Sequence, residues 1–573
     1  MPSVFAGRKR SRALSRETNM DSMRFILLIC LAMVTMKLWT SWETSYGPQT
    51  TPQQVAASGE DPVSAGSGDV PALPDGAGTE SPVRQQEIMA TTTVTPATVE
   101  VSTDVFRIKI DPRGAGIHHA ALLDYPISID KPDEPFVLME DTPGLVYLSQ
   151  GGLLSLQPAP THETLYHPGG NAYALGQGQE GTLSVPFTWS GGGITVNKIF
   201  EFERGSHLIK VRYRIKNNSG ETWSGRSYSQ FKRFNPEQGG MRLIYTYTGA
   251  VISGPENRYE KIAFDDITDQ ALARDTQDGW VAMIQHYFVT ALVPTDKNSA
   301  YHYYTRALDN NLFAAGAITP ALSVAPGEEK EIVEQIYIGP KDQDKLAQIA
   351  TGLDLTVDYG MLWFIAKPLF LGLSEVHKIT GNWGWSIILI TIFLKVLFYK
   401  LSAAGYRSMA NMRRVQPRLI ALRDRYKEDR VRMNQAMMQI YKEEKINPFG
   451  GCLPILVQIP VFIALYWVLL ESIELRQAGF IFWLQDLSTR DPYYVLPLIM
   501  GVTMFIQQKL NPAPMDPVQA KVMMILPFVF TVFFAFFPSG LVLYWVANNV
   551  LSIIQQWMIT RSLERAGLGA KPG

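Results

Sequence analysis

Two patterns of apolar and polar residues divide the chain. Between about residues 101 and 340, short runs alternate apolar and polar positions with a period of two, as Ile209 and Val211 do with the charged residues beside them. Such alternation is typical of strands that turn one face to a core and the other to water. Gly205 separates this run from the one before it, as a hairpin turn does. We therefore predict an antiparallel, all-β sandwich domain over residues 101–345.

The second pattern is a set of long apolar runs. About 20 apolar residues at 1.5 Å per residue cross a bilayer core, so these runs predict a polytopic α-helical membrane protein with six transmembrane helices. The last five form one helical core within 382–573. The runs are Phe25–Trp42, Asn382–Leu401, Cys452–Leu470, Tyr493–Leu510, Met523–Phe537 and Leu541–Ile559.

Basic residues indicate the orientation of these helices. The segment 402–448 carries eleven Lys and Arg against five Asp and Glu, a balance of +6. Positive loops stay in the cytoplasm, and basic residues 8–16 before the first run agree. We expect both termini in the cytoplasm and residues 44–381 on the outer side of the membrane. Met20 is an alternative start to Met1.

The remaining segments complete the expected domain organisation. Residues 44–100 are rich in Pro, Gly, Ser, Ala and Thr and predict a disordered linker. Residues 359–378 place apolar side chains at helical spacing, which favours an amphipathic helix in the membrane interface over a buried helix of the β domain. The predicted parts are 1–43 (N-terminus and anchor), 44–100 (linker), 101–345 (β domain), 346–381 (connector and interfacial helix) and 382–573 (core, with the hairpin 402–448 and a basic tail).

The basic segment 402–448 predicts two helices that turn near 427–430. Leu419, Leu422 and Tyr426 share one helical face, and Met433 and Met437 share another. Flexible thioethers tolerate varied partners, so the methionines either receive nascent chains or only pack the hairpin, and both interpretations stay open. The candidate residues of the hairpin are Met409, Met412, Arg413, Arg414, Met433 and Met437.

Lys395 is a full charge inside a predicted membrane helix, and Thr391 lies one turn before it. A charged side chain at the bilayer centre costs roughly 2.5–3.5 kcal/mol on insertion scales, which makes it a candidate functional residue. The alternative is a lysine that extends its ammonium to the interface near Lys400.

Several kinds of chemistry are excluded or not favoured. The net charge is −1 and the two cysteines, Cys30 and Cys452, lie in apolar runs, so a disulfide scaffold and a cysteine zinc site are excluded. No phosphate-binding G-x-x-x-x-G-K-[ST] motif is present. His162 and His167 are spaced by five, not the four of a zincin helix, and are expected to be surface polar residues. We predict no enzyme activity, cofactor, metal or nucleotide, and no direct readout of nucleic acid.

Specific motifs carry a resemblance to a known family. The run from Asn447 to Phe462 begins Asn-Pro-Phe-Gly-Gly-Cys-Leu-Pro, Phe537–Tyr544 reads Phe-Pro-Ser-Gly-Leu-Val-Leu-Tyr, and Asn548 is followed by Gln555-Gln556. These motifs resemble the YidC/Oxa/Alb membrane protein insertases. The segments that begin at Asp358 and Asp278 resemble the interfacial helix and periplasmic domain of the Gram-negative YidC form.

The resemblance implies a hydrophilic groove, open to the cytoplasm and to lipid, within a five-helix core. Lys395 stands where the family has Arg, Lys400 where it has Pro, and Trp545 where it has the second Tyr of a pair. A lysine keeps the charge but lacks the bidentate fork of arginine. The implied groove residues are Lys395, Thr391, Gln458, Tyr544, Trp545 and Asn548.

The implied function is a membrane protein insertase and chaperone that acts alone or with the Sec translocon. Its partners would be nascent membrane proteins, the lipid bilayer and the Sec translocon, with a ribosome contact left open. The alternatives are a small-anion transporter or channel and a carbohydrate-active periplasmic domain. The first predicts internal repeats with broken helices, and the sequence shows no such symmetry.

Overall fold

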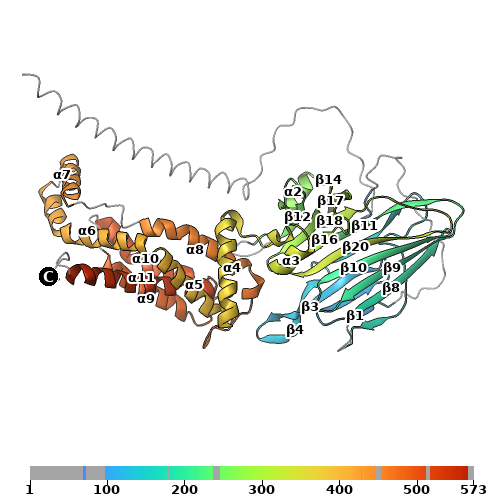
Figure 1. Cartoon of the computed structure of the whole chain (residues 1–573), viewed down its shortest axis with the longest axis horizontal. Helices are drawn as coiled ribbons and strands as arrows, with labels where there is room; N and C mark the ends of the chain where they lie inside the picture. The colour runs from blue at the N-terminus through green and yellow to red at the C-terminus, as the bar shows by residue number, and fades with distance from the viewer. Residues whose placement is uncertain are drawn as a thin grey trace, which may run out of the picture. The chain divides into compact units, whose positions relative to one another are not determined.

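The computed structural model describes residues 69–72, 97–176, 181–235, 246–426, 429–444, 453–511 and 517–565 (Figure 1). The predicted first membrane helix, the alternative start at Met20, the basic tail after 565 and most of the predicted linker lie outside these residues. Strands occupy the chain from Val99 to Pro340, and helices dominate after Trp363.

The described strands form two sheets packed as a sandwich. The first has the order β14 (Ala273–Thr276), β17 (Tyr301–Leu308), β18 (Leu312–Ile318), β11 (Trp223–Phe234), β5 (Tyr147–Ser155), β3 (Gly116–Ser128), β2 (Phe106–Asp111), β1 (Val99–Ser102), β7 (Ala172–Ala174), with β19 (Leu322–Val324) on β11 and β4 (Lys131–Met139) on β3. The second has the order β13 (Glu260–Ile262), β12 (Gly249–Ser253), β15 (Trp280–Gln285), β16 (Phe288–Val293), β20 (Glu329–Pro340), β10 (Leu208–Asn217), β9 (Ile194–Glu203), β8 (Thr182–Gly191), β6 (His167–Pro168).

Strand β10 confirms the predicted alternation. Ile209 and Val211 are buried in the core between the sheets, while Arg212 lies on the other face and pairs with Glu201 and Glu331 of the neighbouring strands. Gly205 has a φ of +68° in the turn before β10, a conformation that favours glycine. Apart from the parallel pair β1–β7, the described strand pairs are antiparallel.

The predicted linker is structured at one point. Residues 69–72 lie against the β domain, where Asp69 pairs with Lys232 and Arg306 donates a hydrogen bond to the Val70 carbonyl. Strand β1 also begins at Val99, two residues before the predicted start of the domain.

The helices follow the predicted apolar runs closely. They are α2 (Phe264–Asp269), α3 (Gln343–Ile349), η1 (Leu353–Thr356), η2 (Gly360–Leu362), α4 (Trp363–Thr380), α5 (Trp383–Leu397), α6 (Tyr399–Arg425), α7 (Arg430–Glu443), α8 (Leu453–Glu471), η4 (Ile473–Leu475), α9 (Val495–Leu510), α10 (Pro517–Phe534) and α11 (Ser539–Arg565). Helix α6 ends at Arg425 and α7 begins at Arg430, on either side of the turn predicted near residues 427–430, of which residues 427–428 lie outside the described range.

The prediction of one continuous helix over Asn382–Leu401 was wrong. Helix α5 ends at Leu397, and α6 leaves it at an angle of 69°. The N–H of Phe398 lies within hydrogen-bond reach of both the Leu394 and Val396 carbonyls, and its ψ of 12° turns the chain off the axis of α5. The bend places Lys395 in the last turn of α5.

A helix that crosses a bilayer must be both long enough and apolar enough. No single described helix meets both conditions, and the bent pair of α5 and α6 meets them together. Helix α4 buries Leu369 and Leu373 and exposes Trp363 and Phe364, so its exposed face also carries large apolar side chains.

Candidate functional site

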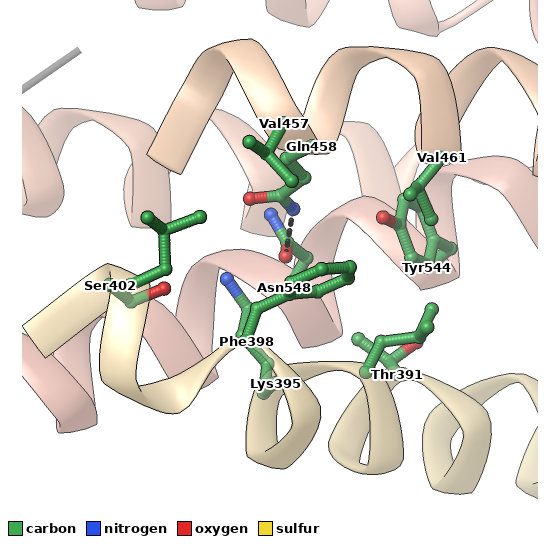
Figure 2. Close-up of a pocket in the computed structure, with 11 residues that line it drawn as sticks. Thr391, Lys395, Phe398, Ser402, Val457, Gln458, Val461, Tyr544 and Asn548 are labelled. Atoms are coloured by element: carbon green, nitrogen blue, oxygen red, sulfur yellow. Dashed lines mark hydrogen bonds between the residues drawn. The ribbon is translucent and has the colours of Figure 1, made fainter. Parts of the chain in front are cut away.

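A cavity of about 280 Å³ lies among α5, α6, α8, α9, α10 and α11. It adjoins a smaller hollow, shown in Figure 2, in which Lys395 and Thr391 of α5 face Gln458 of α8. The two hollows share the lining residues Lys395, Ser402, Gln458, Tyr544 and Asn548. Trp545 lines only the larger hollow and Thr391 only the smaller one, so each of the six predicted groove residues borders one or both hollows.

Lys395 turns its side chain into this space from the last turn of α5. Its Nζ donates a hydrogen bond of 2.8 Å to Ser552 Oγ on α11. In the described part of the chain no carboxylate forms an ion pair with this ammonium, so it meets the cavity as an uncompensated charge, partly shielded from solvent. An unpaired cation in a low-dielectric site attracts an anionic group strongly.

Gln458 and Asn548 join the two sides of the cavity. The Gln458 amide donates a hydrogen bond to Asn548 Oδ1, which links α8 to α11 (Figure 2). The hydroxyl of Tyr544, one turn before Asn548, also hydrogen-bonds Gln458. These three polar side chains therefore form one network on a wall that is otherwise apolar.

Thr391 and Trp545 line the hollows without joining the hydrogen bond between Gln458 and Asn548. The Thr391 hydroxyl donates to the Ile387 carbonyl at 2.6 Å, so its proton is used within α5. Trp545 packs edge-on against Phe462, with ring centroids 4.6 Å apart. Its indole Nε1 is buried and has no acceptor among the described residues. Trp545 thus provides an apolar wall with one unmet donor.

The structure separates most hairpin candidates from the cavity. Met409 lines it, whereas Met412 and Met437 pack in a small cluster with Val415 and Leu419 between α6 and α7. Met433 is half-buried on α7, and Arg413 is exposed. Arg414 is also exposed and pairs with Glu444 at 2.6 Å. The contacts of Met412 and Met437 are those expected of methionines that pack the hairpin.

Sequence reasoning missed several polar residues of the cavity. Ser552 and Asn549 of α11 line it, as do Tyr406 of α6 and Gln508 of α9. A signal was present for α11, where Asn548, Ser552 and Gln555 recur at helical spacing and mark one polar face of an otherwise apolar helix. Tyr406 carried no such signal in the sequence. It reaches the cavity from α6, whose direction is set by the bend at Phe398.

One histidine prediction was wrong. His162 is buried and its Nδ1 lies 2.6 Å from the Tyr228 hydroxyl, while His167 is exposed as expected. Burial lowers the pKa of His162 to about 4. No group of three His, Cys, Asp or Glu residues poised to hold a metal occurs among the residues that the structure describes.

A β-rich domain joined to a helical bundle with a charged internal cavity is an arrangement suited to handling membrane polypeptides. Family models place the chain in that class: residues 98–371 match the YidC periplasmic domain, and residues 375–566 match the 60Kd inner membrane protein family. The chain is 47% identical over 555 residues to the membrane protein insertase YidC of Nitrosococcus oceani, which covers 96% of this chain and 100% of that protein. It is 48% identical over 550 residues to the YidC of Methylococcus capsulatus, at 95% and 99% coverage.

The chain therefore belongs to the YidC family of membrane protein insertases, as the motifs predicted. It is an inner-membrane insertase with a β-rich periplasmic domain and a helical C-terminal region, and its family is one of insertases, not of enzymes. The relatives named as insertases favour this function over the small-anion transporter or channel. A crystal structure of an active YidC insertase is also similar, with 18% identity, a TM-score of 0.38 and coverage of 80% of this chain and 92% of that one; this likeness carries no further conclusion.

Proposed function

We propose that the cavity around Lys395 is the groove in which the hydrophilic tail of an inserting protein begins to cross the membrane. The observation that carries this proposal is the hydrogen-bonding of the Lys395 ammonium to a hydroxyl, with no ion-pair partner among the described residues. Bare charge in hydrocarbon is very costly, so a polar cavity partway into the bilayer shortens the distance over which a tail lacks water.

The charge of Lys395 attracts acidic residues of the tail. Gln458, Tyr544 and Asn548 offer amide and hydroxyl groups beside it, which replace part of the lost water. The incoming apolar helix then moves into lipid along α8 and α10. Both helices expose large apolar side chains, including Ile463 of α8 and Phe528 and Val532 of α10.

No nucleotide is required for this step. Burial of about 20 apolar residues of a substrate helix is favourable at about 25 cal/mol for each Å² of apolar surface removed from water. The insertase then lowers the barrier for the polar tail and leaves the driving force to the substrate.

The finer topology belongs to the same proposal. The net positive hairpin of α6 and α7 lies in the cytoplasm, both termini are cytoplasmic, and α4 lies in the outer interface with Trp363 and Phe364 toward lipid. The Sec translocon remains a proposed partner of the periplasmic side, supported by the resemblance of the motifs, and the ribosome of the cytoplasmic side.

The test is insertion of a small single-span substrate with an acidic tail into proteoliposomes. Lys395→Ala should slow tail translocation by about tenfold, equivalent to about 1.4 kcal/mol of barrier. Lys395→Glu should slow it more, because a carboxylate repels the tail. Lys395→Arg should stay close to the unmodified protein, and a neutral-tailed substrate should be affected less.

Lys400→Ala is the matched control, since Lys400 is exposed at the start of α6 and does not line the cavity. Equal insertion by the Lys395→Ala and Lys395→Glu variants on acidic-tailed substrates would contradict the proposal. Lys395 would then be an interfacial anchor.

A further inference from the structure

Ser552 lies where three helices meet at the cavity. On α11 it comes one turn after Asn548, and its Oγ donates a hydrogen bond of 2.7 Å to the Asn548 carbonyl. Lys395 of α5 donates to the same oxygen at 2.8 Å, and Tyr406 of α6 lies beside Ser552 in the lining of the cavity. These contacts join α5, α6 and α11 through one side chain.

The hydrogen-bond capacity of a serine determines which groups at Ser552 donate and which accept. A hydroxyl has one proton and two lone pairs. The Ser552 proton is used on the Asn548 carbonyl, so the oxygen has lone pairs left with which to accept a hydrogen bond. Lys395 can only donate, and it uses one of these lone pairs. One of the three N–H groups of the ammonium donates to Ser552, and the other two remain available to donate to groups in the cavity.

The hydrogen bond from Lys395 to Ser552 orients a side chain that has little orientation of its own. An ammonium is a compact point charge on a flexible four-carbon stem, and it lacks the rigid fork through which an arginine fixes its own orientation. Lys395 also lies in the last turn of α5, three residues before the bend at Phe398. A fixed acceptor on the neighbouring helix supplies the missing orientation.

We propose that Ser552 is a positioning residue for Lys395, with Tyr406 holding Ser552 from α6. The three together keep the ammonium at the wall of the cavity with its free N–H groups toward an arriving carboxylate. The inference rests on the proposed function of Lys395 as the groove cation. It differs from a purely local role, because a serine that bonds its own i−4 carbonyl is common in helices and need not affect any other residue.

Chemical labelling of Lys395 measures the positioning directly. The full-length protein in proteoliposomes is treated with a small amine-acylating reagent over a series of pH values, and acylation of Lys395 is followed by mass spectrometry. Ser552→Ala should raise the acylation rate by about fivefold, since the hydrogen bond that favours the charged amine is gone. Ser552→Thr keeps the hydroxyl and should restore the original rate. Tyr406→Phe should give a smaller change in the same direction.

Ser386→Ala is the matched control. Ser386 also lies on a membrane-facing helix and donates to its own i−4 carbonyl, of Asn382, but it does not line the cavity. It should leave Lys395 labelling unchanged. The same labelling after Ser552→Ala as in the unmodified protein would overturn the inference.

Insertion assays separate this inference from the proposed function. Ser552→Ala should slow insertion of an acidic-tailed substrate by about fivefold and Ser552→Thr should not. In a Lys395→Ala background, Ser552→Ala should cause no further loss, and a further loss of similar size would overturn the positioning role. If Lys395→Ala alone has no effect on insertion, the proposed function fails, while the labelling result still decides whether Ser552 positions Lys395.

Discussion

The buried side chain of His207 makes the stability of the β domain depend on pH. The imidazole packs edge-on against Phe106, with ring centroids 5.3 Å apart, and is 4% exposed. Neither ring nitrogen has a hydrogen-bond partner within the described ranges. Burial lowers the pKa of His207 to about 4, and the carboxylates of Asp342 and Asp104 oppose this shift only in part. The folded β domain therefore holds this histidine neutral where an unfolded chain would protonate it.

The pH dependence follows from this difference. Between about pH 6.5 and pH 4 the unfolded state binds a proton at His207 that the folded state does not bind, so stability falls as the pH falls through that window. His207→Leu should remove about 2 kcal/mol of the loss between about pH 7 and pH 5. At neutral pH the variant should be as stable as the unmodified protein or more so, because two unpaired buried nitrogens are removed.

Denaturant unfolding of the full chain in detergent at the two pH values measures the effect. His167→Leu is the control, since His167 is exposed on β6. An acid sensitivity unchanged by His207→Leu would show that other groups account for it.

At the scale of the element, small residues determine how closely two helices approach. Gly501 of α9 faces Thr531 of α10, and a Cβ added at Gly501 would overlap Thr531 Oγ1. Close approach of helices through small residues is the usual source of packing energy inside a membrane, where hydrophobic burial no longer drives association.

Gly501→Ala should therefore lower the free energy of unfolding by about 1–3 kcal/mol, as overpacking does. Thr531→Ala in the same chain should recover most of the loss by removing the overlapping oxygen. The melting temperature in detergent gives the readout. Gly372→Ala on α4 serves for comparison, because its added Cβ would meet only the end of the Ile390 side chain. If Thr531→Ala does not recover the stability lost in Gly501→Ala, the overlap with Thr531 is not the cause of that loss.

At the scale of the whole molecule, the segment that follows α8 is fixed to the strands. His286 Nε2 lies 2.8 Å from the Leu470 carbonyl at the end of α8. Ile473 is part of the hydrophobic core of the β domain, and Arg476 donates to the Pro126 carbonyl at 2.7 Å. Since α8 also carries Gln458, the β domain is in direct contact with a helix that lines the cavity.

A buried ion pair lies at the same junction. Lys341 Nζ and Glu471 Oε2 are 3.7 Å apart, with side chains 2% and 4% exposed. Burial lowers the pKa of Lys341, and the Glu471 carboxylate opposes that shift. Each charge is tolerated because the other is present.

Lys341→Met should destabilise the protein by about 3–5 kcal/mol, because it leaves a carboxylate buried without its cation. Lys341→Met combined with Glu471→Leu should recover most of that loss. Thermal unfolding of the full chain would show both effects. Lys345→Met, which removes a more exposed partner of Asp342, should change stability by less than about 1 kcal/mol. A double variant as unstable as the single one would contradict the pairing.

The sequence by itself determined the two regions and most of their elements. Alternation at Ile209 and Val211 reflects a pleated strand with one buried face, and this depends only on neighbours along the chain. The apolar runs that became α8, α9 and α11 are local for the same reason. The motifs around Gln458 and Tyr544 identified the family, and each of the six predicted groove residues lines one or both of two neighbouring hollows.

Only the tertiary structure decided the rest. The bend at Phe398 divides a run that reads in sequence as one mostly apolar helix, and the buried His162 contacts Tyr228 of the distant strand β11. Ser552 meets Lys395 across 157 residues of chain, and Lys341 meets Glu471 across a junction between strands and helix. Periodicity reports which face of an element is buried, whereas hydrogen bonds and ion pairs between distant segments depend on packing, which brings together side chains that no local pattern relates.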